Sequence, residues 1–303
     1  MRRLFAALLL LLPSAAAAYL VTSWHLAEDL IRPRNPENPD TSIPEGVDRV
    51  LRVDRPDGAV IDTWVLLPTA PKPPRAVDTV VVLHGISDQK RTMISLGRRF
   101  QRHGVMAVLI DLRGHGLSSA VPITYGAREV EDIAAVLDAV EAEVAPVGEV
   151  GAYGPSYGAA VALQLPAGDR RVARVVAVAA FASMRRLVRP LLAQEWEAMA
   201  WLIPDALTDV LVDRAGALGG FDPDEASPQR RVAEAPASAR MLVVHSRDDE
   251  TIPYPQALDI VQSCGERCEL LTLEGMNHHE SLSNLELRRA LHHFLVGEEW
   301  TGH

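Results

Sequence analysis

Short, continuous runs of apolar residues recur six times along the chain, with helix-like sequence between one run and the next. A continuous apolar run is typical of a strand that is buried on both faces of a sheet. Strands that alternate with helices indicate a mostly parallel sheet with helices on both faces, so the fold class is α/β. The six runs are residues 79–83, 105–110, 150–153, 172–180, 241–244 and 270–273.

The first strands of the domain have a different pattern. Residues 49–53 and 60–67 alternate apolar and polar side chains around a turn at residues 55–58, which predicts two antiparallel strands. Residues 129–144 carry apolar side chains at helical spacing and predict a helix. The chain of 303 residues could hold one large domain or two small ones, and the order of the motifs favours one domain over residues 47–303.

An uncharged segment at the N-terminus predicts export. Arg2 and Arg3 precede residues 4–24, which carry no charge. The segment fits either a cleaved signal peptide or a membrane anchor, and the anchor is favoured because the uncharged run continues past its alanines. The folded domain would then lie outside the cytoplasm on a membrane, or be secreted or periplasmic if the signal is cleaved. Residues 25–46 contain four prolines and predict a linker.

Charge and cysteine content limit the partners. The formal net charge is −10, with 30 lysines and arginines against 40 aspartates and glutamates, so a nucleic acid is not an expected partner. Cys264 and Cys268 are the two cysteines of the chain. In an exported protein they are expected to form a disulfide, and the alternative is two free thiols. The histidines are adjacent pairs or isolated residues, so no metal is expected.

A glycine-flanked serine follows the predicted strand at residues 150–153. The sequence Gly154-Pro155-Ser156-Tyr157-Gly158 precedes a run of small, helix-forming residues. A serine with glycine two residues away on each side, between a strand and a helix, is typical of a nucleophile elbow. The glycines are needed because the turn is too tight for side chains at those positions. Ser156 is therefore the candidate nucleophile.

A serine nucleophile needs a base, and the base needs an acid to orient it. Asp248 and Asp249 follow the predicted strand at residues 241–244, and His278 and His279 follow the one at residues 270–273. The order serine, aspartate, histidine is that of α/β-hydrolases. At each pair, the residues alone leave both neighbours open.

These motifs together resemble the serine hydrolases of the α/β-hydrolase superfamily. The resemblance is closest to bacterial exported or membrane-anchored esterases and lipases related to prolyl-oligopeptidase-type catalytic domains. It covers residues 47 to 296 and includes five further matches. These are His84-Gly85, the segment from Asp111 to Ser118, Tyr125-Gly126 with Glu129 and Asp132, Ser246-x-x-Asp249-x-x-Ile252-Pro253, and Gly275-x-x-His278.

The resemblance implies a role for each site residue. Ser156 would be the nucleophile, His278 the base, and Asp249 the acid, since its distances from Ser246 and Pro253 fit the family pattern and those of Asp248 do not. The backbone N–H groups of Ile86 and Tyr157 would form the oxyanion hole. The expected enzyme is a carboxylesterase that needs no cofactor and acts on a small-molecule or lipid-like ester. An amidase or peptidase, a thioesterase, or a binding protein that kept the fold without the chemistry are the alternatives.

Residues 181–235 are expected to form a short helical cap between two strands. They include many large apolar residues that could line a substrate pocket or bury the helices against the sheet, and both interpretations stay open. The apolar residues are Met184, Leu187, Leu191, Leu192, Trp196, Met199, Trp201, Leu202, Ile203 and Leu207. The sequence does not indicate an oligomeric state.

Overall fold

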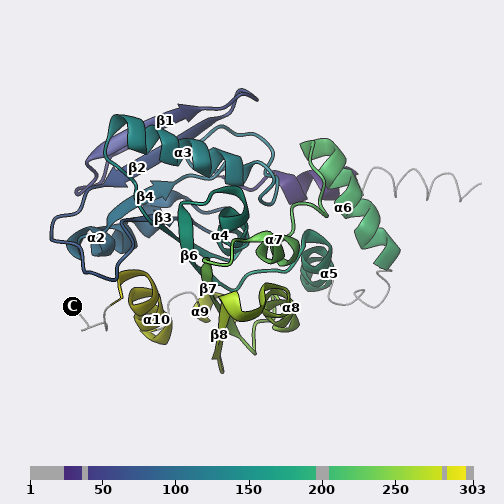
Figure 1. Ribbon diagram of the computed structural model, residues 1–303. Coiled ribbons are helices and arrows are strands. Elements are labelled where there is room, and N and C mark those ends of the chain that lie inside the picture. Colours follow the sequence, from purple (N-terminus) through teal and green to yellow (C-terminus); the bar gives the residue numbers. More distant parts are fainter. Residues whose placement is uncertain (1–23, 36–39, 196–204, 282–284, 298–303) are drawn as a thin grey trace, which may run out of the picture.

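The computed structural model describes residues 24–35, 40–195, 205–281 and 285–297, and it has one twisted sheet between two layers of helices (Figure 1). The eight strands lie in the order β1-β2-β4-β3-β5-β6-β7-β8. β2 is antiparallel to both β1 and β4, and all other neighbours are parallel. The predicted α/β-hydrolase architecture is thus confirmed.

All eight predicted strands are present, with ends that differ from the prediction by at most a few residues. Their bounds are β1 Arg49–Asp54, β2 Val60–Leu66, β3 Thr79–Val82, β4 Met106–Ile110, β5 Val150–Pro155, β6 Val172–Val178, β7 Arg240–Ser246 and β8 Cys268–Leu273. The central strands β3 and β4 are buried along their whole length, which explains their continuous apolar sequence.

Alternate residues of each strand point to opposite faces, so the sheet separates two hydrophobic cores. Val81 and Val243 belong to the core beneath α3, α4 and α8, whereas Val82 and Val244 belong to the core beneath α2 and α10. The helices of the first layer are α3 Glu129–Glu143, α4 Tyr157–Gly168 and α8 Pro255–Cys264. Those of the second are α2 Ile94–Arg102 and α10 Leu285–Val296, with the short helix η1 Lys90–Met93 before α2.

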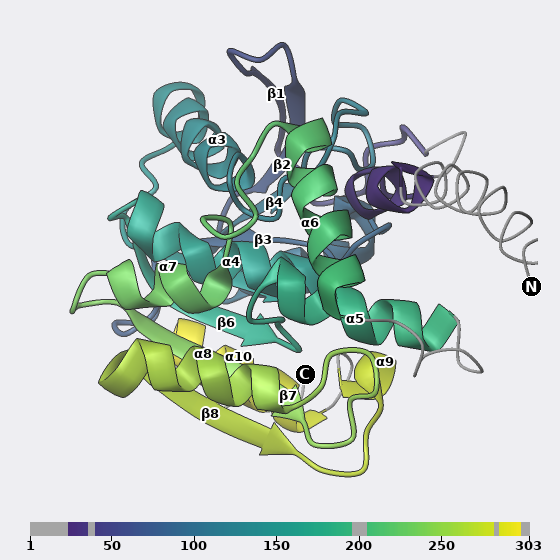
Figure 2. The same ribbon diagram turned by 90° about the vertical axis from the view of Figure 1, so that its right-hand side faces the viewer.

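The described part of the predicted cap region contains three helices with different positions. α5 Met184–Glu195 packs against α6 Asp205–Gly219, while α7 Pro228–Glu234 packs against α4 and α8 in the first helical layer. α5 and α6 extend beyond the sheet edge near its carboxyl ends (Figures 1 and 2). Met184 is fully buried in the core. Part of this region therefore packs against the sheet, which is one of the two interpretations of its apolar residues. Trp196, Met199, Trp201, Leu202 and Ile203 lie outside the described residues.

The segment predicted as a linker begins differently in the structure. Residues 24–31 form a helix, and its Ala27 and Ile31 side chains are fully buried against the domain. Figure 2 shows this helix beside α6, where Arg214 stacks on the ring of Trp24 at 5.4 Å. The body of the protein therefore includes residues before Val47. The two buried side chains are four residues apart and lie on one face of the helix. A single pair at this spacing is too short a pattern to predict a helix in a segment that contains prolines.

The predicted signal or anchor falls mostly on residues 1–23, outside the described residues. Within the described ranges, no helix is both long and apolar enough to cross a membrane.

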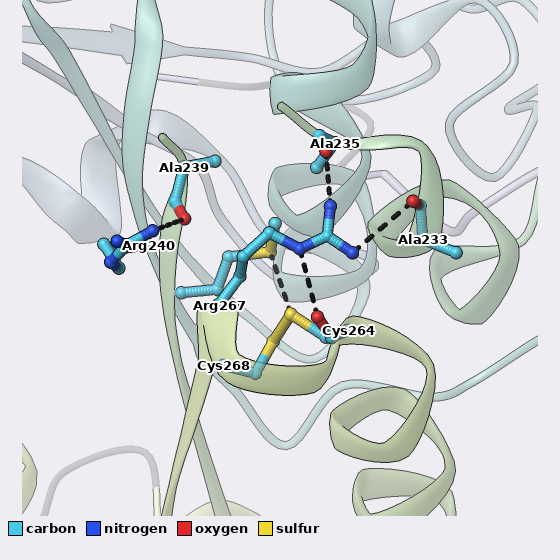
Figure 3. The surroundings of a disulfide bond; sticks show 8 residues. Ala233, Ala235, Ala239, Arg240, Cys264, Arg267 and Cys268 are labelled. Carbon is cyan, nitrogen blue, oxygen red and sulfur yellow. Dashed lines mark hydrogen bonds between the residues drawn. A yellow bond between two sulfur atoms is a disulfide. The ribbon is translucent and has the colours of Figure 1, made fainter. Parts of the chain in front are cut away.

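Cys264 and Cys268 form a disulfide across the short helix η3 Gly265–Arg267 (Figure 3). It joins the end of α8 to the start of β8. Between the cysteines, Arg267 donates a hydrogen bond from Nε to the Cys264 carbonyl at 3.0 Å and others to the carbonyls of Ala233 and Ala235 (Figure 3). The favoured interpretation of the two cysteines is thus the one observed.

Candidate active site

Ser156 stands in a strained turn between β5 and α4. Its φ angle is 50° and its ψ angle −116°, a conformation that a residue with a side chain rarely adopts. The turn is also crowded: a Cβ atom at Gly154 would lie 2.2 Å from the Gly158 carbonyl oxygen, and one at Gly158 would lie 2.4 Å from the His84 carbonyl oxygen. Both positions therefore require glycine, as the elbow prediction expected.

Two loops at the carboxyl edge of the sheet bring an imidazole and a carboxylate to Ser156. His278, the first residue of α9 His278–Ser281, has its Nε2 atom 3.1 Å from Ser156 Oγ. Its Nδ1 atom lies 2.7 Å from Asp249 Oδ2. Ser246 at the end of β7 donates a hydrogen bond of 2.6 Å to the Met276 carbonyl, which ties the loop of the acid to the loop of the base. The structure therefore joins the three residues that the sequence placed in separate loops.

Asp249 is a buried and ionised partner for the imidazole. Burial raises the pKa of Asp249, but hydrogen bonds from His278 and from the Ile252 backbone outweigh it, so the pKa of this carboxyl lies below its ordinary value. Its second oxygen accepts hydrogen bonds from the backbone N–H groups of Thr251 at 3.0 Å and Ile252 at 2.8 Å. The carboxylate is thus fixed in place with one oxygen directed at His278.

The neighbouring residues that the sequence left open lie elsewhere. Asp248 is exposed, and its carboxylate accepts a hydrogen bond of 2.6 Å from the Gly275 backbone N–H. Among the described residues, this bond joins Asp248 to the next loop and not to His278. His279 is exposed and presents its ring edge to His278 at 5.7 Å between centroids. The geometry therefore selects Asp249 and His278 from the two pairs.

The loop after β3 lies against the serine on its other side. A Cβ atom at Gly85 would be 4.0 Å from the Ser156 Cβ atom, and Ile86 lines the same cavity as Ser156 and Tyr157. Tyr157 is the first residue of α4, where backbone N–H groups have no partner within the helix. The two predicted oxyanion residues thus lie in the wall of the same cavity as the serine.

Buried charges hold this loop to the sheet. Lys90 follows the loop in the sequence, and its side chain is fully buried. Its ammonium group pairs with Asp62 at 2.7 Å and also with Asp111. Asp111 accepts further backbone hydrogen bonds from Lys90 and Leu117. His84 accepts one from the Leu112 N–H at 3.1 Å, and burial keeps the pKa of His84 below its ordinary value. Asp111 and His84 therefore hold neighbouring loops together.

Glu129 supports the site in a way that sequence reasoning missed. It opens α3 and is completely buried, and its carboxylate accepts a hydrogen bond of 2.9 Å from the Tyr157 hydroxyl. The same carboxylate accepts hydrogen bonds from the Thr124 backbone and hydroxyl and from the Gly126 backbone, at 2.6 to 2.8 Å. The motif at residues 125–132 matched the family, but the spacing gave no sign that this carboxylate points inward to the elbow.

Ser156 and His278 line a cavity of about 510 Å³ with mostly apolar walls. This volume is within the range of about 300–1,000 Å³ for small-molecule sites. Leu187 and Leu191 of α5 form part of the wall, so the second interpretation of the cap region also holds for these residues. A wall residue that the sequence did not suggest is Leu30, from the N-terminal helix. The remaining lining is Asp29, Gly85, Ile86, Asp88, Met93, Tyr125, Tyr153, Pro155, Tyr157, Phe181, Thr251, Ile252 and His279.

An eight-stranded sheet of this order, with a serine elbow at the carboxyl end of its fifth strand, defines an α/β-hydrolase. The model of the family described as serine aminopeptidase, S33 (Hydrolase_4) matches residues 73–235, more than half of the chain. The chain belongs to this family, and it is a hydrolase of the α/β type. No protein with a curated description matches it.

Solved structures support the same fold. An esterase of Pyrococcus furiosus is 16% identical, with a TM-score of 0.67 over 89% of this chain and 99% of the esterase. A puromycin-hydrolyzing peptidase of Mycobacterium tuberculosis is 19% identical, with a TM-score of 0.58 over 84% of this chain and 40% of the peptidase. A serine hydrolase without lid from Xanthomonas campestris is 19% identical, with a TM-score of 0.54 over 84% of this chain and 95% of that protein.

Proposed function

We propose that this protein hydrolyses carboxylic esters through an acyl-serine intermediate, with Ser156, His278 and Asp249 as its catalytic triad. The observation that carries the proposal is the unbroken chain of hydrogen bonds from Ser156 Oγ through His278 to Asp249 Oδ2, at 3.1 and 2.7 Å. These distances are within reach of proton transfer, and the chain ends in a cavity large enough for a small molecule.

The proposed reaction has two steps. Ser156 Oγ attacks the ester carbonyl while His278 Nε2 takes its proton, and the negative oxygen of the tetrahedral intermediate accepts hydrogen bonds from the Ile86 and Tyr157 backbones. The carbon–oxygen bond breaks, His278 gives the proton to the departing alcohol, and the acyl group stays on Ser156. Water, deprotonated by His278, then attacks the acyl-enzyme and releases the acid and the free serine.

An amide substrate is the second candidate, because of the family description and the peptidase among the similar structures. We favour the ester for two reasons. An alkoxide leaves a tetrahedral intermediate more readily than the unprotonated nitrogen of an amide does. The cavity walls are mostly apolar, which suits an acyl group better than a charged peptide terminus.

The test uses the full-length protein in detergent. A fluorophosphonate should label Ser156, as read by mass mapping of the peptides, and p-nitrophenyl esters should be hydrolysed while the matching p-nitroanilides are not. The matched control is Ser156→Ala, which should keep the fold and the Tm but lose labelling and about 10⁶-fold in kcat. Faster turnover of the anilides would replace the esterase proposal with the amidase. A folded protein that neither reacts with the fluorophosphonate nor hydrolyses any of these substrates would refute the proposed catalytic activity.

We further propose that the chain is exported. The Cys264–Cys268 disulfide supports this, because such bonds persist in oxidising compartments outside the cytoplasm. The uncharged residues 4–24 after Arg2 and Arg3 supply the signal or the membrane anchor.

A further inference from the structure

The N-terminal helix, residues 24–31, is a fixed wall of the active-site cavity. Its Leu30 and Asp29 line the same cavity as Ser156 and His278. Two hydrogen bonds hold the end of this helix to the domain. The Tyr125 hydroxyl donates one to the Leu30 carbonyl at 2.7 Å, and the Ile123 N–H donates the other to the Ile31 carbonyl at 2.9 Å. A segment that precedes the sheet by about twenty residues thus shapes the place where a substrate would bind.

A second cavity of about 340 Å³ continues beneath this helix. It shares Asp29, Leu30, Ile86 and Leu191 with the first cavity, so the two cavities are neighbours with a common wall. Three further leucines line it, namely Leu26 of the N-terminal helix, Leu192 of α5 and Leu211 of α6. The views in Figures 1 and 2 agree that this helix lies against α6 on the same side as α5.

Few charged groups border the two cavities, and Asp29, which borders both, is exposed. Arg32 and Arg34 line the second cavity, and Arg32 pairs with Glu28 at 3.0 Å in an exposed ion pair. Among the described residues that line the first cavity there is neither lysine nor arginine, and the carboxylate of Asp88 there already accepts hydrogen bonds from Gln89 and Thr92. The stretch from Ser156 to the second cavity is therefore bounded mainly by leucine and isoleucine side chains.

We infer that the substrate carries a long acyl chain, whose near part fills the first cavity and whose far part lies beneath the N-terminal helix. The inference rests on the proposed ester hydrolysis and names its substrate class. A long alkyl chain matches two neighbouring cavities whose common wall is mainly leucine and isoleucine, because burial of each methylene is favourable. A short acyl group would leave the second cavity unused.

The test fills the second cavity without touching the first. In full-length protein, Leu26→Trp places a large ring where Leu26 lines only the second cavity. We expect kcat/KM for p-nitrophenyl dodecanoate to fall by about 10-fold or more, since a single methylene of contact in an apolar pocket is worth about 10-fold. The value for p-nitrophenyl butanoate should stay close to wild type. His25→Trp, the exposed neighbour on the same helix, is the matched control and should change neither.

The other outcomes decide against the inference. Equal losses on both esters, no loss on either, or a wild-type enzyme that prefers butanoate would overturn it. If Leu26→Trp does not fold, Leu26→Phe makes the same comparison with a smaller ring.

A binding measurement separates this inference from the esterase proposal. Dodecanoic acid, the product, should raise the Tm of Ser156→Ala and raise it less when Leu26→Trp is added. If dodecanoic acid binds but the wild type hydrolyses no ester, the esterase proposal is refuted and the long-chain pocket is not. If the wild type hydrolyses esters but dodecanoic acid causes no such Tm shift, the long-chain pocket is refuted and the esterase proposal is not.

Discussion

At the scale of single residues, the carboxylate of Asp249 is held in place by three hydrogen bonds. One oxygen contacts His278, and the other accepts two backbone hydrogen bonds. His245 lies on the far side, with its Nε2 atom 3.6 Å from Asp249 Oδ2 and 2.8 Å from the Ile252 carbonyl that it donates to. Burial keeps the pKa of His245 below its ordinary value, so His245 is a neutral neighbour of the carboxylate.

This confinement predicts opposite effects for two adjacent aspartates. Asp249→Asn should lower kcat by about 10⁴-fold, because the amide would favour the wrong tautomer of His278 and could not stabilise its positive charge. Asp248→Asn should leave kcat near the wild-type value, since Asp248 only accepts a hydrogen bond from the Gly275 backbone, which an amide oxygen can also do. Steady-state kinetics on a p-nitrophenyl ester measures both. A larger loss in Asp248→Asn would assign the acid to the other residue.

At the scale of elements, the strands and the elbow were predictable because their signals are local. A strand buried on both faces must be apolar throughout, as in β3 and β4, and the turn at Ser156 admits only glycine at positions 154 and 158. The three residues of the proposed triad follow strand ends in a fixed order, so the parallel sheet brings their loops together.

Other parts depend on contacts between distant segments and left no local signal. Acidic residues at the start of a helix are usually explained by the helix dipole, yet Glu129 and Asp132 are both buried. Asp132 meets the guanidinium groups of Arg55 and Arg113, which lie 77 and 19 residues away. The docking of residues 24–31 likewise depends on partners near residue 123 and in α6. Only the fold reveals such pairings.

Glu129 gives an element-scale prediction, because it joins the start of α3 to the start of α4. Burial raises the pKa of Tyr157 well above its ordinary value, so its hydroxyl donates to the Glu129 carboxylate. In Glu129→Gln, the new NH₂ group must face one of the backbone or hydroxyl donors that now bind the carboxylate. We expect a loss of about 1–3 kcal/mol in the free energy of unfolding, measured with urea.

The same substitution should also disturb the elbow. Tyr157 would lose a partner, and its backbone N–H is the proposed oxyanion donor, so kcat should fall while KM changes little. Glu131→Gln, on the exposed side of the same helix, is the matched control and should alter neither stability nor kcat. An unchanged kcat in a destabilised Glu129→Gln would limit this residue to a structural role.

At the scale of the whole molecule, the features outside the sheet agree with one another. The N-terminal helix lines the active-site cavity, and in the sequence it follows the uncharged residues 4–24. The disulfide fastens α8 to β8, which is an edge strand of the sheet. An edge strand with one neighbour gains the most from such a link, because unpaired edges fray and associate readily.

Export and the disulfide can be tested together by counting free thiols in the full-length protein and in a variant that lacks residues 1–23. Both are denatured in the presence of a maleimide polymer, which adds to each free thiol and slows the chain on a gel. The full-length protein from bacterial cells should take up no polymer, because its cysteines are oxidised outside the cytoplasm. The variant keeps the helix at residues 24–31 but should stay in the cytoplasm and take up two polymers, one on each cysteine.

After purification, oxidation of the variant should raise its free energy of unfolding by about 2 kcal/mol, as expected for a loop this short. Two free thiols in the full-length protein would count against both the export proposal and a native disulfide.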